Sequence, residues 1–147
     1  MVLNLKTAKT DDAADLSVWK STKGLRSDPF LVVSFFTNDP IYRRHIERLH
    51  NGLEEFGLEY ELFMIDSLGG WELNCAFKSA FVVEQMMKSG RPVLWLDADS
   101  TLEKRPTLLF EIKEDFAVSR VNGSVFNSAV VYFSNSSASL DLAVRSA

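Results

Sequence analysis

The sequence predicts an α/β domain with a mostly parallel central sheet flanked by helices. Apolar runs of strand length, rich in β-branched and aromatic residues, alternate with helical patterns in the order strand, helix, strand, helix, strand. Parallel strands need a helix-length return between them, and this order provides it. With 147 residues, 46% of them hydrophobic and 24% charged, the chain is long enough for one globular domain.

The first elements follow a polar N-terminal segment. Residues 1–29 carry charge without periodicity, and we expect a loosely attached arm with one short helix before a patterned domain at 30–147. "FLVVSFFT" has the composition of a strand buried on both faces. Asp39, followed by a proline, matches a helix N-cap, and Gly57 matches the glycine beyond a helix end. The apolar stripe of this helix consists of Tyr42, Ile46, Leu49, Leu53 and Phe56.

The later elements continue the alternation. Residues 60–66 form the second strand, and residues 71–89 form a second helix that Gly90 closes. We expect its core-facing stripe to contain Leu73, Ala76, Phe77, Ala80, Val83 and Met87. "VLWL" is the third strand and "TLLF" a short helical turn. "FAVSRV" and "VFNSAVVYF" are two further strands, and "SASLDLAVRSA" is a last helix.

Charge and cysteine content exclude several classes of function. A net charge of −4 gives no general attraction to nucleic acid or to anionic lipid. Cys75 is the only cysteine, so the chain can form neither an intrachain disulfide nor a thiolate zinc cluster. The sequence has no secretory leader pattern and no apolar run long enough for a transmembrane segment. We therefore expect a cytoplasmic protein.

Polar residues follow the first and third strands at the point where each strand ends. Thr37, Asn38 and Asp39 follow the first strand, and Asp97 and Asp99 follow the third. Ligands of such sheets bind outside the carboxyl ends of the strands, so we expect both groups to line one cleft. Two carboxylates one residue apart can both face Mg²⁺ or Mn²⁺. The alternative is that they only end a strand and cap the following turn.

The second helix adds three polar or aromatic candidates. Trp71, Asn74 and Lys78 share one face, opposite the predicted core stripe, and the helix begins at the sheet edge where ligands bind. Taken alone, Lys78 also fits a solvated helix face. A large aromatic side chain on a surface, such as Trp71, often marks a contact.

"DADSTL", which begins at Asp97, resembles the first motif of the haloacid dehalogenase superfamily. That resemblance implies a phosphatase with one aspartate as nucleophile and the next as general acid. The superfamily also needs a lysine at the end of a later strand and a further acidic pair, whereas Asp115 and Asp141 stand alone in the short remainder. Its motif lies near the start of the domain, whereas here two strands precede it. The phosphatase is therefore the disfavoured alternative.

A second resemblance covers more of the chain. "FFTNDPIY", a lysine midway along the second helix, "VLWLDADSTL", "LLF" and "FNSAVVYF" occur in the order found in metal-dependent retaining glycosyltransferases of the GT-A fold, such as the glycogenin-like and related bacterial enzymes. The resemblance spans 30–133. It implies a GT-A type sheet and transfer of a sugar from a nucleotide-diphosphate donor, a UDP-sugar, to an unknown acceptor.

The resemblance also implies a set of site residues. Asp97 and Asp99 would hold the Mn²⁺ or Mg²⁺ that bridges the donor's diphosphate, with Asp99 as the more direct ligand. Tyr42 would stack on the base or lie in the core, and Asn127 would line the sugar pocket or bond to backbone. Ala129 stands where the family has a glycine. The full set is Thr37, Asn38, Asp39, Tyr42, Trp71, Asn74, Lys78, Asp97, Asp99, Asn127 and Ser128.

The resemblance ends before the last features of that family. Its members continue with a helix that carries an acidic residue and a glutamine, and with a histidine that completes the metal site, whereas this sequence stops at Ala147. We therefore expect a truncated form of the fold without an assignable catalytic residue. It would be part of an enzyme, a protein completed by a partner chain, or a non-catalytic nucleotide-diphosphate-binding or interaction module. Apolar surface left by an incomplete sheet predicts a homodimer.

Overall fold

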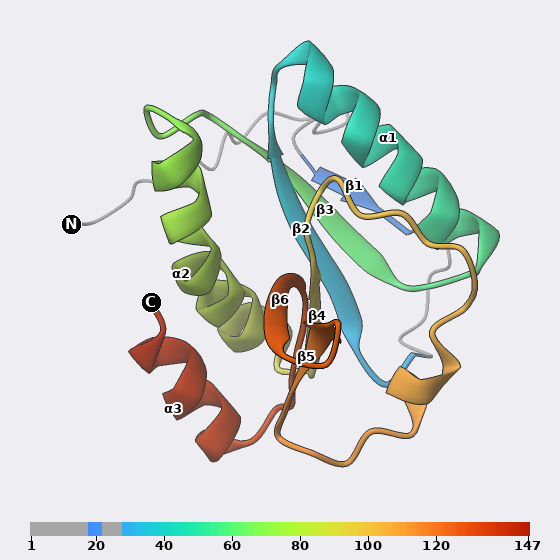
Figure 1. Cartoon of the computed structure of the whole chain (residues 1–147), viewed down its shortest axis with the longest axis vertical. Coiled ribbons are helices and arrows are strands. Elements are labelled where there is room, and N and C mark those ends of the chain that lie inside the picture. Colours follow the sequence, from blue (N-terminus) through green and yellow to red (C-terminus); the bar gives the residue numbers. More distant parts are fainter. Residues whose placement is uncertain (1–17, 22–27) are drawn as a thin grey trace, which may run out of the picture.

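The computed structural model describes residues 18–21 and 28–147, which form a six-stranded sheet between two helical layers (Figure 1). Helix α1 covers one face of the sheet, and helices α2 and α3 cover the other. The strands are β1 (Val18–Lys20), β2 (Leu31–Thr37), β3 (Tyr60–Ile65), β4 (Val93–Leu96), β5 (Phe116–Val121) and β6 (Val125–Phe133). The helices are α1 (Pro40–Glu55), α2 (Trp71–Ser89) and α3 (Ser137–Arg145).

The sheet is mixed, and only its three central strands match the expected parallel arrangement. Its order is β1-β3-β2-β4-β6-β5, with β3, β2 and β4 parallel and the remaining pairs antiparallel. Helices α1 and α2 provide the returns that parallel strands need. Between β4 and β5 the chain contains only a 3₁₀ turn, Thr107–Phe110, and no helix of the length that a parallel return needs. A tight turn at Asn122 and Gly123, both with positive φ, joins β5 to β6. The prediction of a mostly parallel sheet is therefore wrong for the strands outside this centre.

Helix α1 begins and ends where its sequence signals predict. The carboxylate of Asp39 accepts hydrogen bonds from the backbone N–H groups of Ile41 and Tyr42, each at 3.0 Å. Gly57, just beyond the C-cap, has a φ of 63°. The predicted stripe packs on β2 and β3, with Ile46, Leu49 and Leu53 fully buried and Tyr42 and Phe56 partly buried.

The buried face of α2 matches the predicted one only in part. Phe77 and Val83 are partly buried and pack against the core as predicted, but Leu73 and Met87 are 56% and 70% exposed. Phe81 and Val82, which were not predicted, are buried against the sheet. Apolar side chains occur around the whole helix, so periodicity alone did not determine its orientation. Phe81 packs on Phe35, Phe63 and Trp95, which decides which face turns inward. Lys78 precedes Phe81 and Val82 by three and four residues and therefore lies on the face toward the sheet.

Most of the predicted N-terminal arm, 1–29, lies outside the described residues, and the prediction of a short helix in it is not tested. Within the arm, Val18–Lys20 forms an edge strand antiparallel to β3. The division of the chain at residue 29 stays a prediction. None of the helices described in 28–147 combines the length and the apolar composition needed to cross a bilayer.

Candidate functional site

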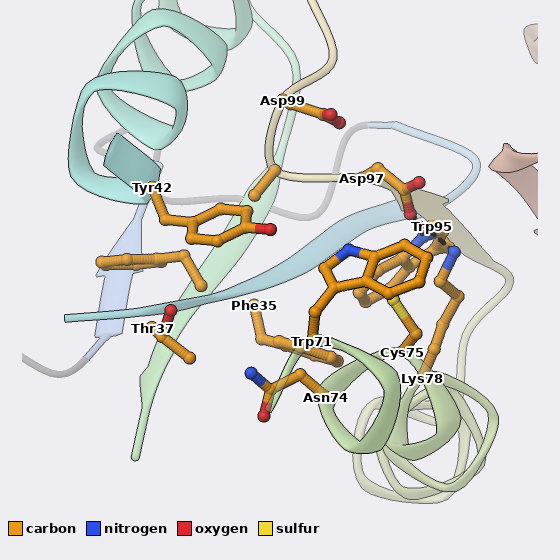
Figure 2. A pocket seen from close by; sticks show the side chains of 12 residues that line it. Phe35, Thr37, Tyr42, Trp71, Asn74, Cys75, Lys78, Trp95, Asp97 and Asp99 are labelled. Atoms are coloured by element: carbon orange, nitrogen blue, oxygen red, sulfur yellow. Dashed lines mark hydrogen bonds and ion pairs between the residues drawn. The ribbon is translucent and has the colours of Figure 1, made fainter. Parts of the chain in front are cut away.

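Two adjoining pockets lie at the carboxyl ends of β2 and β4, between α1 and α2. The first, shown in Figure 2, is lined by Phe35, Phe36, Thr37, Tyr42, Trp71, Asn74, Cys75, Lys78, Trp95, Asp97, Ala98 and Asp99. The second is lined by Thr37, Asn38, Asp39, Tyr42, Ile65, Asp66, Ser67, Gly70, Trp71 and Asn74. All the predicted site residues except Asn127 and Ser128 therefore line one pocket or both.

A tight turn after β4 places the two aspartates. The backbone N–H of Asp97 donates to the carbonyl of Ala129 on β6 at 2.9 Å, which extends the sheet pairing by one residue. The N–H of Ser100 then donates to the carbonyl of Asp97 at 2.9 Å and closes the turn. Side chains alternate along a strand, so Asp97 lies on the same face as Trp95, the face that α2 covers.

The carboxylate of Asp97 is bound by two donors from the protein. Its Oδ1 accepts a hydrogen bond from Nε1 of Trp95 at 2.6 Å and lies 2.7 Å from Nζ of Lys78. The same ammonium donates to the carbonyl and hydroxyl oxygens of Ser128 at 3.1 and 3.4 Å, and it lies 5.2 Å from the centre of the Trp95 ring. Lys78 thus joins α2 to Ser128 on β6 and to Asp97 at the end of β4, and Figure 2 shows it beside Asp97 and Trp95.

Asp99 differs from Asp97 in its surroundings. It is exposed, and within 18–21 and 28–147 its carboxylate has no hydrogen-bond or ion-pair partner. Over the same residues, no group of three or more His, Cys, Asp or Glu side chains could hold a metal ion. Two carboxylates on one turn nevertheless suit a hard cation such as Mg²⁺ or Mn²⁺ whose other ligands are phosphate oxygens and water. Asp97 and Asp99 are therefore the residues of this turn that could serve as protein ligands to such a cation.

The end of β2 supplies the second group of predicted residues. Thr37 is buried, and its hydroxyl donates to Oδ2 of Asp39 at 2.6 Å. This bond, together with those from the backbone N–H groups of Tyr42 and Ile41, holds the pKa of Asp39 below its ordinary value. The carboxylate of Asp39 therefore serves the start of α1, while Asn38 beside it is exposed to the second pocket.

Tyr42 belongs to both the core and the pocket wall. Its ring packs against the α1 side of the core, and its hydroxyl points into the pocket in Figure 2. Burial raises the pKa of its phenol, and electrostatic interaction with the acidic groups around it adds to the effect. Both predicted roles of the ring, burial and stacking, are compatible with this position.

The first turn of α2 forms the remaining wall. Trp71 is 69% exposed and lines both pockets. The Asn74 side chain accepts a hydrogen bond from the N–H of Leu68 at 2.9 Å and donates to the hydroxyl of Ser67 at 3.4 Å. Asn74 therefore fixes the loop between β3 and α2, and Trp71 is the freer of the two to meet a ligand.

The predicted residues on β6 are not brought to these pockets directly. Oδ1 of Asn127 accepts from the N–H of Ala129 at 2.9 Å, the local backbone bond that was its alternative role. Ser128 is connected to the site through Lys78. Trp95 was not predicted as a site residue. It precedes Asp97 by two residues in extended chain, so the sequence already placed both side chains on the same face.

Comparison with known proteins identifies the fold. No protein-family model and no curated protein matches the sequence. A solved structure described as a glycosyltransferase involved in the glycosylation of the major capsid of PBCV-1 is similar, with a TM-score of 0.58 and 17% sequence identity. The match covers 80% of this chain and 65% of the length of that protein. The chain therefore has a mixed α/β fold similar to that of a glycosyltransferase.

Proposed function

We propose that the chain is a metal-dependent glycosyltransferase of GT-A type, or the donor-binding part of one, and that its substrate is a nucleotide-diphosphate sugar, most simply a UDP-sugar. The observation that carries this proposal is the turn after β4. Asp97 and Asp99 leave the strand into a pocket that also contains Lys78, in a fold similar to that of a glycosyltransferase. In sheets of this kind, ligands bind outside the carboxyl ends of the strands.

The side chains around the pocket suit the parts of such a donor. Asp97 and Asp99 offer hard oxygen ligands to Mn²⁺ or Mg²⁺, which, when bound, would neutralise charge on the departing diphosphate. Lys78 would add positive charge beside the phosphate oxygens. The rings of Tyr42 and Trp71 offer apolar faces to the base or the sugar. The acceptor and the catalytic residue stay unassigned.

The proposal is tested first by binding. Isothermal titration of UDP, with Mn²⁺ and in its absence, should show saturable binding that depends on the cation in the wild type and disappears in Asp99→Ala. Asp141→Ala is the matched control, because it removes an exposed carboxylate on α3 that lines neither pocket. If UDP with Mn²⁺ gives no binding to the wild type, the proposed donor site is wrong.

Turnover then separates an enzyme from a second candidate, a non-catalytic module that binds a nucleotide diphosphate or pairs with another chain. That candidate is favoured by the two protein donors already on Oδ1 of Asp97, which leave a weaker metal site. Release of UDP from a panel of UDP-sugars, lost in Asp99→Ala, supports the enzyme. Binding without release supports the module. Hydrolysis of a simple phosphomonoester, lost in Asp97→Asn, would instead support the phosphatase.

A further inference from the structure

The positively charged side chain of Lys78 lies beside Asp97 within the proposed metal-diphosphate site. We propose that Lys78 is a tethered competitor of the divalent cation: its ammonium holds Asp97 until a diphosphate offers it other anionic oxygens. Metal binding without nucleotide is then weak, and nucleotide and metal bind cooperatively. This inference rests on the proposed function. It adds a reason why the site would bind a divalent cation weakly when no nucleotide is present.

The geometry of the ammonium carries the first step. Nζ of Lys78 is 2.7 Å from Oδ1 of Asp97, the distance of a charge-assisted hydrogen bond. The Lys78 side chain is 20% exposed and that of Asp97 is 31% exposed, so solvent screens this pair less than a pair on the open surface. Two positive charges cannot share one carboxylate oxygen without strong repulsion. A cation that approaches Oδ1 therefore has to displace Lys78, and one that binds the other carboxylate oxygen, Oδ2, is repelled by the ammonium across the same carboxylate.

The other partners of Lys78 show why it stays near the site when displaced. Its ammonium also donates to the carbonyl and hydroxyl of Ser128, and it lies over the ring of Trp95. These neutral contacts hold the end of the side chain at the pocket after the bond to Asp97 is broken. Phosphate oxygens in the pocket would give it a new charged partner, while Asp97 would become available to the metal.

The asymmetry between the two aspartates supports the same conclusion. Asp99 is exposed and has no partner within the described residues, so it is open to a cation at all times. One carboxylate with water holds a divalent cation weakly, because such sites depend on the number of charged ligands. Release of Asp97 adds the second carboxylate only when nucleotide is present. Because linkage is reciprocal, the metal must also strengthen nucleotide binding by the same factor.

The test measures Mn²⁺ binding without nucleotide, by the loss of the electron paramagnetic resonance signal of free Mn²⁺. Lys78→Met should bind Mn²⁺ about tenfold tighter than the wild type, because a charged hydrogen bond that competes with the ion is removed. The same variant should bind UDP with Mn²⁺ less tightly. Lys88→Met is the matched control: it removes an exposed charge from the same helix, paired with Glu84, and should leave Mn²⁺ affinity unchanged.

The outcomes distinguish this inference from the proposed function. If the wild type binds UDP with Mn²⁺ but Lys78→Met binds Mn²⁺ alone no tighter, the competition is refuted and the donor site stands. If the wild type binds no UDP, the donor site is wrong, whatever Lys78→Met does. Lys78→Arg keeps the positive charge and should retain weak Mn²⁺ binding; a gain as large as that of Lys78→Met would also refute the competition. Lys78→Gln replaces Lys78→Met if the latter shows no cooperative unfolding.

Discussion

Asp97 and Asp99, the two aspartates of the turn after β4, should differ greatly in how much their removal lowers the stability of the fold. Asp97→Ala and Asp99→Ala each remove one carboxylate from the same turn and change the net charge equally. Asp97 accepts from Trp95 and pairs with Lys78, whereas Asp99 has no partner within the described residues. The first substitution leaves the indole N–H of Trp95 without its acceptor and leaves the partly buried ammonium of Lys78 with only its neutral acceptors on Ser128. The second removes only a solvated group.

The size of the difference follows from these contacts. A hydrogen bond to a charged group contributes about 1.5–3 kcal/mol, and partial exposure of Lys78 and Asp97 places the loss near the lower end, about 1–2 kcal/mol. Asp99→Ala should stay within about 0.5 kcal/mol of the wild type, as surface substitutions do. For a chain of this length, Asp97→Ala should lower Tm by about 3–8 °C.

Urea unfolding followed by tryptophan fluorescence, together with thermal unfolding followed by circular dichroism, measures both variants. Equal stability of Asp97→Ala and Asp99→Ala would refute the structural role given to the bonds of Asp97. A larger loss in Asp99→Ala would refute it more strongly. Asp141→Ala again serves as the control, because its carboxylate is exposed and pairs only with Arg145 on the same helix.

Two further predictions concern the elements that build the site. The pKa of Asp39 is lowered from its ordinary value of 3.8 by Thr37 and the N–H groups of α1. The ionised carboxylate therefore stabilises the fold above pH 3.8, and this stabilisation is lost as pH falls through the lowered pKa. Asp39→Ala should lower the free energy of unfolding by about 1 kcal/mol at pH 7. Urea unfolding should show a smaller cost at pH 2, and an equal cost at both pH values would contradict this. Phe81→Ala should cost about 3–5 kcal/mol and Leu73→Ala, at a 56% exposed position, under about 1 kcal/mol; similar losses in urea unfolding would show that the buried face of α2 is misassigned.

The sequence contained enough local information to predict almost every element. Helix α1 was predictable because Asp39 and Gly57 mark its ends and its apolar residues repeat on one side only. Strands β2 and β4 were predictable because continuous apolar runs of this length suit strands buried on both faces. The antiparallel outer strands were harder to predict, since strand direction depends on connections that the strands themselves do not encode.

The orientation of α2 shows where periodicity is insufficient. Leu73 and Met87 are apolar but exposed, while Lys78 faces the sheet. A lysine on that face is stable because Asp97, nineteen residues away in the chain, pairs with it at the end of β4 and Ser128 on β6 accepts hydrogen bonds from it. No local pattern shows such a pairing. Lys78 lines the pocket, but it does so from the face toward the sheet and not from the predicted face opposite the core stripe. Its role at the site stays a prediction.

The candidate site was predictable to the extent that it depends on topology. Parallel strands bring the ends of β2 and β4 to one edge, so Thr37, Asp97 and Asp99 line a common pocket. The contacts of the polar groups were predictable only where they are local. Asp39 caps α1 as its sequence position predicts, and Asn127 makes the backbone bond that was one of its two predicted roles. The bonds that Asp97 makes to Trp95 and Lys78 depend on how α2 packs on the sheet, which no local pattern shows.

Equilibrium binding of UDP in the presence of Mn²⁺ tests the central claim, a nucleotide-diphosphate site at the β4 turn, most directly. Isothermal titration should show one saturable site in the wild type and in Asp141→Ala, no binding in Asp99→Ala, and no binding in any of them after chelation of the metal. The claim is contradicted if the wild type binds no UDP, or if Asp99→Ala binds it as tightly as the wild type does.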